Sequence, residues 1–301
     1  MDQTSASPGN LLQSWRRKRR LSQLDLASEA GISQRHLSFV ESGRSQPSRD
    51  MVLLLAEHLA IPMRERNALL LAAGYAPHYR ERALDDPDLK TAREAVDRIL
   101  RGHEPHPALA VDRHWNLISA NRAIEFLIQG VDETLLLPPA NVLRLSLHPK
   151  GLGPRIVNYR QWRAHVIERL KRQMDHLPDA ALAALVEEIK SYPVPAGAKP
   201  YREDTALNAI AVPFVLATGR GTLSFISTTT VFGTAVDITL SELVIESFFP
   251  ADEQTAEIMR QVAIPERANA ETLDALAEVE RGGLRQFDSV EELFEDLHSE
   301  D

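Results

Sequence analysis

Three polar side chains that could read DNA base pairs lie within one short stretch of the chain. Gln34 and Arg35 follow Ser33, a residue type that favours a helix N-cap, and Ser38 comes one turn later. Glutamine amides pair bidentately with adenine, and arginine guanidinium groups pair in the same way with guanine. Such side chains near the start of a helix are typical of a helix that enters the major groove.

Basic side chains flank this stretch. The run 16–20 contains four arginines and one lysine, and Arg44 and Arg49 follow the predicted helix. Residues 10–50 hold eight basic and four acidic side chains, a local net charge of +4. These groups suit phosphate contacts, which add affinity but read no sequence. The alternative is an ordinary helical hairpin with a solvated basic face.

Caps and apolar spacing predict the elements that hold these side chains. Ser22 and Asp25 predict a capping box at the start of one helix, and Gly31 predicts its end. Ser48 predicts the start of a further helix after the basic loop. The residues expected to face the core are Leu24, Ala27, Ala30, Ile32, Leu37 and Val40.

Three motifs here resemble the Cro/repressor-like (XRE) DNA-binding domains. They are Gln23 at a helix start, Gly31-Ile32-Ser33 at the turn, and the loop Glu41-Ser42-Gly43-Arg44-Ser45-Gln46-Pro47. The resemblance implies an all-α helix-turn-helix domain of five helices over residues 9–76, in which Gln23 and Arg44 hold phosphates. The full set of residues expected to contact DNA is Arg16, Gln23, Ser33, Gln34, Arg35, Ser38, Arg44 and Ser48.

The charge of the chain is unevenly distributed. The 301 residues have a net charge of −9, and residues 264–301 alone hold twelve acidic and three basic side chains. The acidity therefore belongs to the end of the chain and does not argue against DNA binding near its beginning. There is no cysteine, which excludes disulfides and thiol-based sites. No apolar run is long enough to span a membrane and the N-terminus lacks a signal-type apolar segment, so we expect a cytoplasmic protein without membrane contact.

Apolar patterning predicts an α+β domain in the second half of the chain. The expected strands are 108–112, 115–120, 207–217, 221–232 and 242–249, and the expected helices are 121–129, 158–174 and 179–189. The run Thr218-Gly219-Arg220-Gly221 favours a hairpin turn. Five strands that mostly pair with their neighbours predict an antiparallel sheet covered by helices, an arrangement that can enclose an apolar pocket.

Motifs in this half resemble the MmyB-like transcription regulators. They include Trp115-Asn116, Asn121-Arg122-Ala123, His148-Pro149-Lys150-Gly151-Leu152, Val157-Asn158-Tyr159, Thr230-Val231-Phe232-Gly233-Thr234 and Glu246-Ser247-Phe248-Phe249-Pro250. The resemblance implies a PAS-like ligand-binding domain over residues 107–262, with a fatty acid or related molecule as its small apolar ligand. Residues 77–106 would then form a linker with a connecting helix, and residues 263–301 an acidic helical tail.

Apolar candidates for the pocket wall come from both strands and helices. They are Trp115, Ile118, Phe126, Leu143, Trp162, Val166, Phe214 and Phe225, each of which could instead be an ordinary core residue. An acyl carboxylate would need a cation or hydroxyl at the pocket mouth, for which the candidates are Arg122, Tyr159 and Arg163. Apart from a bound fatty acid we expect no cofactor, and the cluster of His103, Glu104 and His106 matches no metal-ligand spacing.

Neither the motifs nor the scattered histidines indicate an enzyme. Gly-x-Ser-x-Gly, a phosphate-binding loop and His-Glu-x-x-His are all missing, so we expect no catalytic activity. One recognition helix reads too few bases for useful specificity. We therefore expect a homodimer on a roughly palindromic double-stranded DNA operator.

The acidic end of the chain indicates a second class of function. Residues 269–280 and 288–297 predict two amphipathic helices. This segment is somewhat similar to the end of a RelB-type antitoxin, which wraps a basic toxin. The resemblance implies a basic protein partner. The alternative is an appendage that stays flexible or packs against its own domain.

Overall fold

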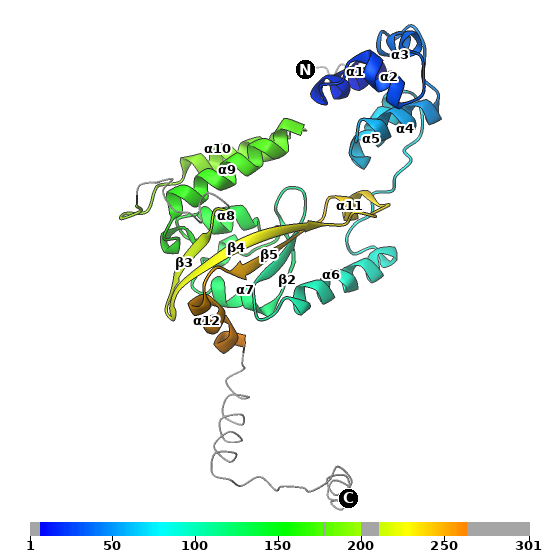
Figure 1. The fold of residues 1–301 in the computed structure, drawn as a ribbon. Helices are drawn as coiled ribbons and strands as arrows, with labels where there is room; N and C mark the ends of the chain where they lie inside the picture. The colour runs from blue at the N-terminus through cyan, green and yellow to red at the C-terminus, as the bar shows by residue number, and fades with distance from the viewer. Residues whose placement is uncertain (1–6, 177–178, 200–210, 264–301) are drawn as a thin grey trace, which may run out of the picture.

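Five helices make up the N-terminal part of the computed structural model, which describes residues 7–176, 179–199 and 211–263 (Figure 1). The helices are α1 (Pro8–Lys18), α2 (Gln23–Glu29), α3 (Gln34–Glu41), α4 (Arg49–His58) and α5 (Met63–Ala72). The prediction of five helices is confirmed. Four of them begin at a serine whose hydroxyl accepts a backbone N–H, at Ser7, Ser22, Ser33 and Ser48.

The core of these helices is a continuous apolar cluster, with fully buried Leu12, Leu37 and Leu55 among its members. Gly31 has a φ of +65°, a conformation that glycine adopts without strain, and it turns the chain between α2 and α3. The prediction that Leu24 faces this core is wrong, because its side chain is 60% exposed and Leu26 takes the inward position instead.

The C-terminal domain is built on one five-stranded sheet in which every pairing is antiparallel. Its strands are β1 (Ala108–Val111), β2 (Leu117–Ala120), β3 (Phe214–Thr218), β4 (Gly221–Val231) and β5 (Val244–Pro250), in the order β2-β1-β5-β4-β3. The predicted α+β class and five-stranded antiparallel sheet are confirmed.

Three of the expected strands begin later than predicted, among them the strand expected at 242–249, which begins at Val244. The strand expected at 115–120 begins at Leu117, because Trp115 has a φ of +69° and its N–H donates to the Asp112 carbonyl, which closes a turn. The strand expected at 207–217 begins at Phe214, and residues 207–210 lie outside the described part of the chain.

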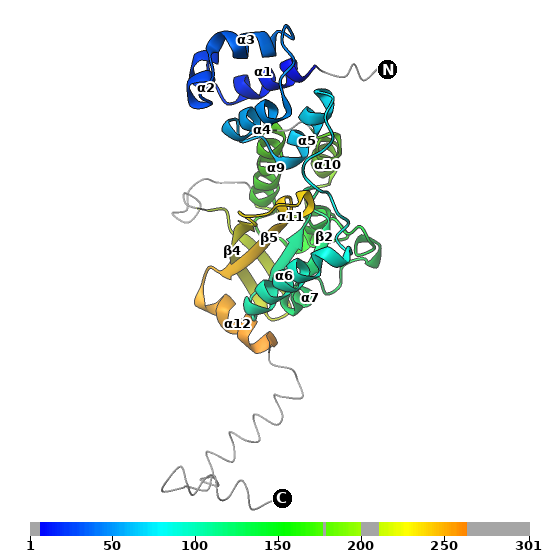
Figure 2. The same cartoon turned by 90° about the vertical axis from the view of Figure 1, so that its right-hand side faces the viewer.

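Helices cover both faces of the sheet (Figures 1 and 2). On one face, Val96 and Leu100 of α6 (Lys90–Gly102) pack against Ala108, Ala110 and Ile245. The other face belongs to the main core, to which five helices contribute: α7 (Arg122–Leu127), α8 (Val142–Leu147), α9 (Tyr159–His176), α10 (Ala180–Ser191) and α12 (Glu253–Ala263). Alternate residues of β1 therefore serve two different clusters, as the strand period requires.

Short elements complete the described chain. They are η1 (Pro87–Leu89), η2 (Glu133–Leu135), η3 (Gly153–Arg155), α11 (Ile238–Ser241) and α12 (Glu253–Ala263). Helices α1–α5 and α12 lie at opposite ends of the molecule (Figures 1 and 2). The two helices expected after residue 264 lie outside the described residues, so the predicted tail and its partner remain predictions.

Candidate DNA-binding surface and ligand pocket

The first turn of α3 presents the predicted base-reading side chains. The Ser33 hydroxyl accepts a hydrogen bond from the backbone N–H of His36 over 3.1 Å and so defines the start of the helix. Gln34 and Arg35 are exposed and Ser38 is half-buried. The structure therefore places an amide, a guanidinium and a hydroxyl near one helix N-terminus, as base reading in the major groove requires.

Phe39 brings two arginines from different elements together. The Arg35 Cζ lies 5.4 Å and the Arg44 Cζ 5.9 Å from the centre of the Phe39 ring. Stacking on an aromatic face restricts a guanidinium group, so the ring aligns both cations on one surface. Phe39 is missing from the predicted contact residues, although its spacing of four residues from Arg35 indicates a shared helix face.

The prediction that Arg16 contacts DNA is wrong. Its guanidinium is buried and donates to both carboxylate oxygens of Glu41, over 2.6 Å and 2.8 Å. A third hydrogen bond, of 2.8 Å, goes to the carbonyl of Leu21. Arg16 therefore ties α1 to the end of α3 and supports the surface from behind.

Glu41 is the centre of a buried polar cluster. Besides the Arg16 bonds it accepts a hydrogen bond from the Gln23 amide over 2.8 Å. Burial would raise the pKa of Glu41, but the hydrogen bonds and positive charge of Arg16, with the bond from Gln23, outweigh burial and lower it. The Gln23 amide nitrogen carries two hydrogens and uses one of them for Glu41. The other hydrogen remains available for the phosphate contact predicted for Gln23. Ser48, also predicted to contact DNA, is exposed and caps α4.

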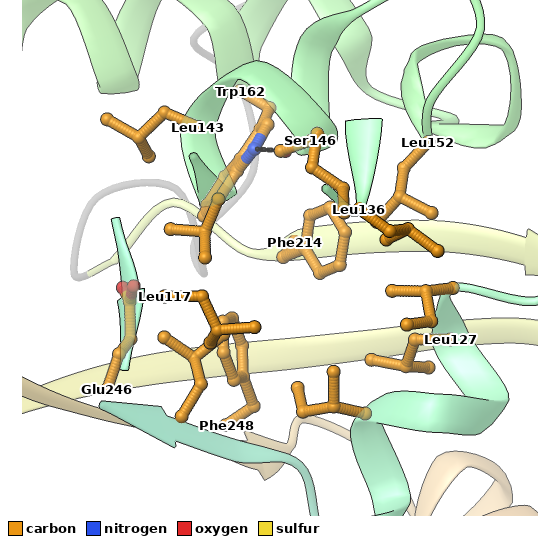
Figure 3. A pocket seen from close by; sticks show the side chains of 15 residues that line it. Leu117, Leu127, Leu136, Leu143, Ser146, Leu152, Trp162, Phe214, Glu246 and Phe248 are labelled. Atoms are coloured by element: carbon orange, nitrogen blue, oxygen red, sulfur yellow. Dashed lines mark hydrogen bonds between the residues drawn. The ribbon is translucent and has the colours of Figure 1, made fainter. Parts of the chain in front are cut away.

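An apolar cavity lies between the sheet and helices α7, α8 and α9 (Figure 3). The centre of a water molecule can reach about 90 Å³ of it. All but two of its lining residues are apolar. They are Leu109, Leu117, Ile124, Leu127, Ile128, Leu136, Val142, Leu143, Leu145, Ser146, Leu152, Trp162, Phe214, Glu246 and Phe248.

The structure places three of the eight predicted apolar residues at this wall: Leu143, Trp162 and Phe214. Trp115, Val166 and Phe225 are buried in the same core without lining the cavity, and Phe126 packs against that core while half-buried. These four residues are therefore ordinary core residues, which was the alternative to a place in the pocket wall. Ile118 packs in the cluster under α6 on the opposite face of the sheet, so its prediction as a lining residue is wrong.

The three predicted carboxylate partners do not line the cavity, which is a further correction. Arg122 is exposed at the start of α7. The Tyr159 hydroxyl donates to the Leu147 carbonyl over 3.1 Å, and Arg163 donates to the Tyr192 carbonyl over the same distance. Tyr159 and Arg163 therefore bind the protein's own backbone.

The two polar groups of the cavity have protein partners. The Ser146 hydroxyl oxygen accepts a hydrogen bond from Trp162 Nε1 over 3.0 Å (Figure 3). The Glu246 carboxylate accepts one from Arg169 over 2.7 Å, and Arg169 also donates to the Thr229 hydroxyl over 2.7 Å. Water gains little in a cavity whose few polar groups are already bonded, and cavities of this kind stay dry and take apolar guests.

A glycine turn holds one side of the cavity. A Cβ on Gly151 would lie 2.1 Å from the carbonyl oxygen of Leu145, so the turn after α8 has no room for a side chain. The next residue, Leu152, donates its N–H to the same carbonyl over 2.9 Å and lines the cavity. This close approach of the backbone to Leu145 explains why a glycine stands in the motif His148–Leu152.

Gly151→Ala is expected to lower the free energy of unfolding of this domain by about 1–3 kcal/mol and to weaken ligand binding, because the backbone that carries Leu145 and Leu152 must move. Urea unfolding monitored by tryptophan fluorescence measures the loss. Gly102→Ala is the matched control, since a Cβ there meets nothing within 4 Å in α6 and alanine favours a helix. Equal stability of the two variants would contradict the steric argument.

Ion pairs connect the helical domain to the sheet domain. Arg64 of α5 donates to both oxygens of Glu242 over 2.8 Å and 2.9 Å, and to both oxygens of Glu81 over 2.8 Å and 2.6 Å. Arg82 of the connecting segment pairs with buried Asp237 over 2.9 Å. The predicted linker is therefore anchored to both domains rather than loose.

His103 Nε2 lies 3.0 Å from the Phe248 carbonyl, and no group of three potential metal ligands occurs within residues 7–176, 179–199 and 211–263. In those same ranges no helix combines the length and the apolar character needed to cross a bilayer.

Two comparisons with protein families agree with this architecture. A family model described as the MmyB-like transcription regulator ligand binding domain matches residues 92–262, and a helix-turn-helix model matches residues 12–66. A search of curated proteins finds no match. Both models describe parts of regulators and not of enzymes. The first covers more than half of the chain, so the protein belongs to the MmyB-like transcription regulators, which join a DNA-binding helix-turn-helix to a ligand-binding domain.

Proposed function

We propose that the ligand sensed by this regulator is a fatty acid or a related acyl compound. The observation that carries the proposal is the lining of the cavity, where only Ser146 and Glu246 interrupt an apolar wall. Transfer of an alkyl chain from water into such a site is favourable for every methylene buried. Trp162 and Phe214, whose ring centres lie 4.9 Å apart, supply flat surfaces that suit a chain without polar groups.

Mass spectrometry of the intact protein as purified, under non-denaturing conditions, tests this proposal. The expected result is an added mass that fragments to an acyl chain and disappears after denaturation. A purified protein that carries no such mass, and that binds no C10–C16 carboxylate or alcohol added to it, would overturn the proposal.

We further propose that two copies bind a roughly palindromic operator through α3, and that the ligand changes their affinity for it. A ligand shifts this equilibrium only if it binds one arrangement of the two domains better than the other. The structure supports one route: β5 carries Glu246 and Phe248 into the cavity wall and begins just after Glu242, the partner of Arg64 in α5.

Glu242→Gln is expected to uncouple the two domains, because it removes the charge that connects Arg64 to the sheet domain. Coupling between two sites in one protein commonly changes affinity about 5- to 150-fold. In the variant we expect dodecanoate to change the affinity for the operator less than about twofold. Operator binding with and without dodecanoate, measured by fluorescence anisotropy, gives this ratio. Glu81→Gln is the control, since it leaves the Arg64–Glu242 pair in place. Unchanged coupling in Glu242→Gln would exclude this route.

Arg35→Ala and Arg44→Ala are expected to weaken DNA binding in different ways. Loss of a base contact from Arg35 should cost about 1–3 kcal/mol on the operator and less on random DNA. Loss of a phosphate contact from Arg44 should weaken both alike and reduce the salt dependence by about one counterion. Anisotropy titrations at several salt concentrations separate the two roles. Arg98→Ala, at an exposed position of α6, controls for the charge change. An equal loss on all DNA for Arg35→Ala would refute base reading.

A second candidate function comes from the net charge of −9 over residues 264–301. We propose that this segment binds a basic protein, as the ends of antitoxins do. Affinity purification of the full chain and of a chain ending at residue 263 tests it. A basic partner that is lost with the segment supports the idea, and its failure to appear with the full chain contradicts it.

A further inference from the structure

A basic groove lies beside the apolar cavity, between α9 and β4. Its polar lining consists of His165, Arg169, Arg172 and Gln173 of α9, with Ser227 and Thr229 of β4, and Ala211 and Val212 complete it. The centre of a water molecule can reach about 520 Å³ of it, so it is wider and wetter than the cavity. None of the residues that line the groove belongs to the cavity wall.

Lining residues of the groove and of the cavity contact one another directly. The indole of Trp162, in the cavity, stacks on the imidazole of His165, in the groove, with ring centres 5.4 Å apart. Glu246 lines the cavity and binds Arg169, which lines the groove, over 2.7 Å. In the sheet, Thr229 pairs with Glu246. An alkyl chain in the cavity therefore needs to extend only past the Arg169–Glu246 pair to reach the groove.

The charges make the groove the better place for an anion. Glu246 at the cavity wall would repel a carboxylate placed beside it. On the other side of the wall, Glu246 balances Arg169, and Arg172 has no hydrogen bond or ion pair with any residue the structure describes. The described side chains of the groove, taken with Glu246, therefore carry a net charge of +1. Burial and the two arginines lower the pKa of His165, so it stays neutral at pH 7. The Thr229 oxygen accepts from Arg169, so its O–H remains a donor.

We propose that this groove is the head-group site of the ligand and takes a single carboxylate, with Arg172 as its counter-ion and the alkyl chain lying in the cavity. The inference rests on the acyl ligand proposed above. A net charge of +1 matches one carboxylate, and hydroxyl and arginine N–H donors are its ordinary partners in proteins.

Calorimetric titration with dodecanoate and with dodecan-1-ol tests the inference, because the two share a chain and differ in head-group charge. The wild-type protein is expected to bind the carboxylate more tightly. Arg172→Ala should weaken dodecanoate about 3- to 10-fold and change dodecan-1-ol less than about twofold, in the range of partly exposed ion pairs. Lys171→Ala is the matched control, because it removes a neighbouring exposed cation of α9 that does not line the groove.

The outcomes separate this inference from the proposal on which it depends. If dodecan-1-ol binds and Arg172→Ala leaves the affinity for dodecanoate unchanged, the assignment of the groove as the head-group site is wrong. The proposal that the cavity binds the alkyl chain is then still supported. A loss of equal size for both ligands, or for Lys171→Ala, overturns it as well. If dodecyl phosphate binds more than tenfold tighter than dodecanoate, the assignment to a single carboxylate is wrong. If no ligand binds the wild-type protein, the acyl ligand itself fails, and the head-group site with it.

Discussion

Replacement of Glu41 by alanine is expected to lower the free energy of unfolding of the helical domain by about 3–5 kcal/mol. The reason is that Arg16, Gln13 and Gln23 all donate to this carboxylate, which is almost completely buried. Removal of one member of a buried pair leaves the other charge without a partner, and that loss is larger than the net gain from the intact pair. Folded domains have only about 5–15 kcal/mol of stability, so operator binding should fall with it.

Chemical denaturation followed by circular dichroism measures this loss, and two further variants identify its cause. Glu41→Gln loses the charge and exchanges one acceptor oxygen for an NH2 donor, but it keeps the side-chain volume and one acceptor oxygen, so its effect should be smaller than that of alanine. The double variant Arg16→Met, Glu41→Leu removes both charges and should recover much of the stability. If the double variant is as unstable as Glu41→Ala, lost packing and not an unpaired arginine is the cause.

The pH dependence of stability gives an independent check on Glu41. Its pKa in the folded domain is lowered by Arg16, so the unfolded chain binds the proton more tightly. Its contribution is therefore complete above the unfolded pKa of about 4.3 and is lost as the pH falls through the lower folded value. The difference in unfolding free energy between wild type and Glu41→Gln should shrink below about pH 4. A difference that stays constant from pH 7 to pH 3 would show that the folded pKa is not lowered.

Local signals predicted the elements well, because caps and turns depend on neighbouring residues. Each serine predicted as an N-cap does cap its helix, at Ser22, Ser33 and Ser48. Gly31 has the positive φ that its turn requires. The exposed residues of α3 follow from that start, so Gln34 and Arg35 were placed correctly. The prediction for Arg16 was wrong, because its partner Glu41 lies 25 residues away and no local pattern shows that two charges meet inside a core.

The lining of the cavity was harder to predict, because successive side chains of a strand point to opposite faces of the sheet. Ile118 and Leu117 are neighbours, yet Leu117 lines the cavity and Ile118 packs under α6. An irregularity in the β1–β2 pairing, between Ala110 and Val111, shifts the register that would have decided between them. Glu246 stands inside a motif that the sequence already singled out. Its role at the wall depends on Arg169, a residue of α9 that no spacing connects to it.

Substitution of Leu143 by tryptophan is expected to abolish binding of acyl ligands, a loss of at least 100-fold in affinity. Leu143 is 5% exposed and lines the cavity, so a larger ring must occupy the space an alkyl chain would take. The extra volume fills a cavity and does not compress a filled core. Its cost in stability should therefore lie at or below the lower end of the usual 1–3 kcal/mol for overpacking.

Thermal unfolding with and without dodecanoate measures this effect. A ligand at 100 times its Kd stabilises the folded state by about 2.7 kcal/mol, which raises the Tm of a domain of this size by about 5–10 °C. The wild-type protein should show this rise and Leu143→Trp a rise below about 1 °C. Leu137→Trp is the matched control, because Leu137 is 65% exposed, does not line the cavity and should keep the full rise. A full rise in Leu143→Trp would place the ligand outside the cavity, since the space it needs there would already be taken.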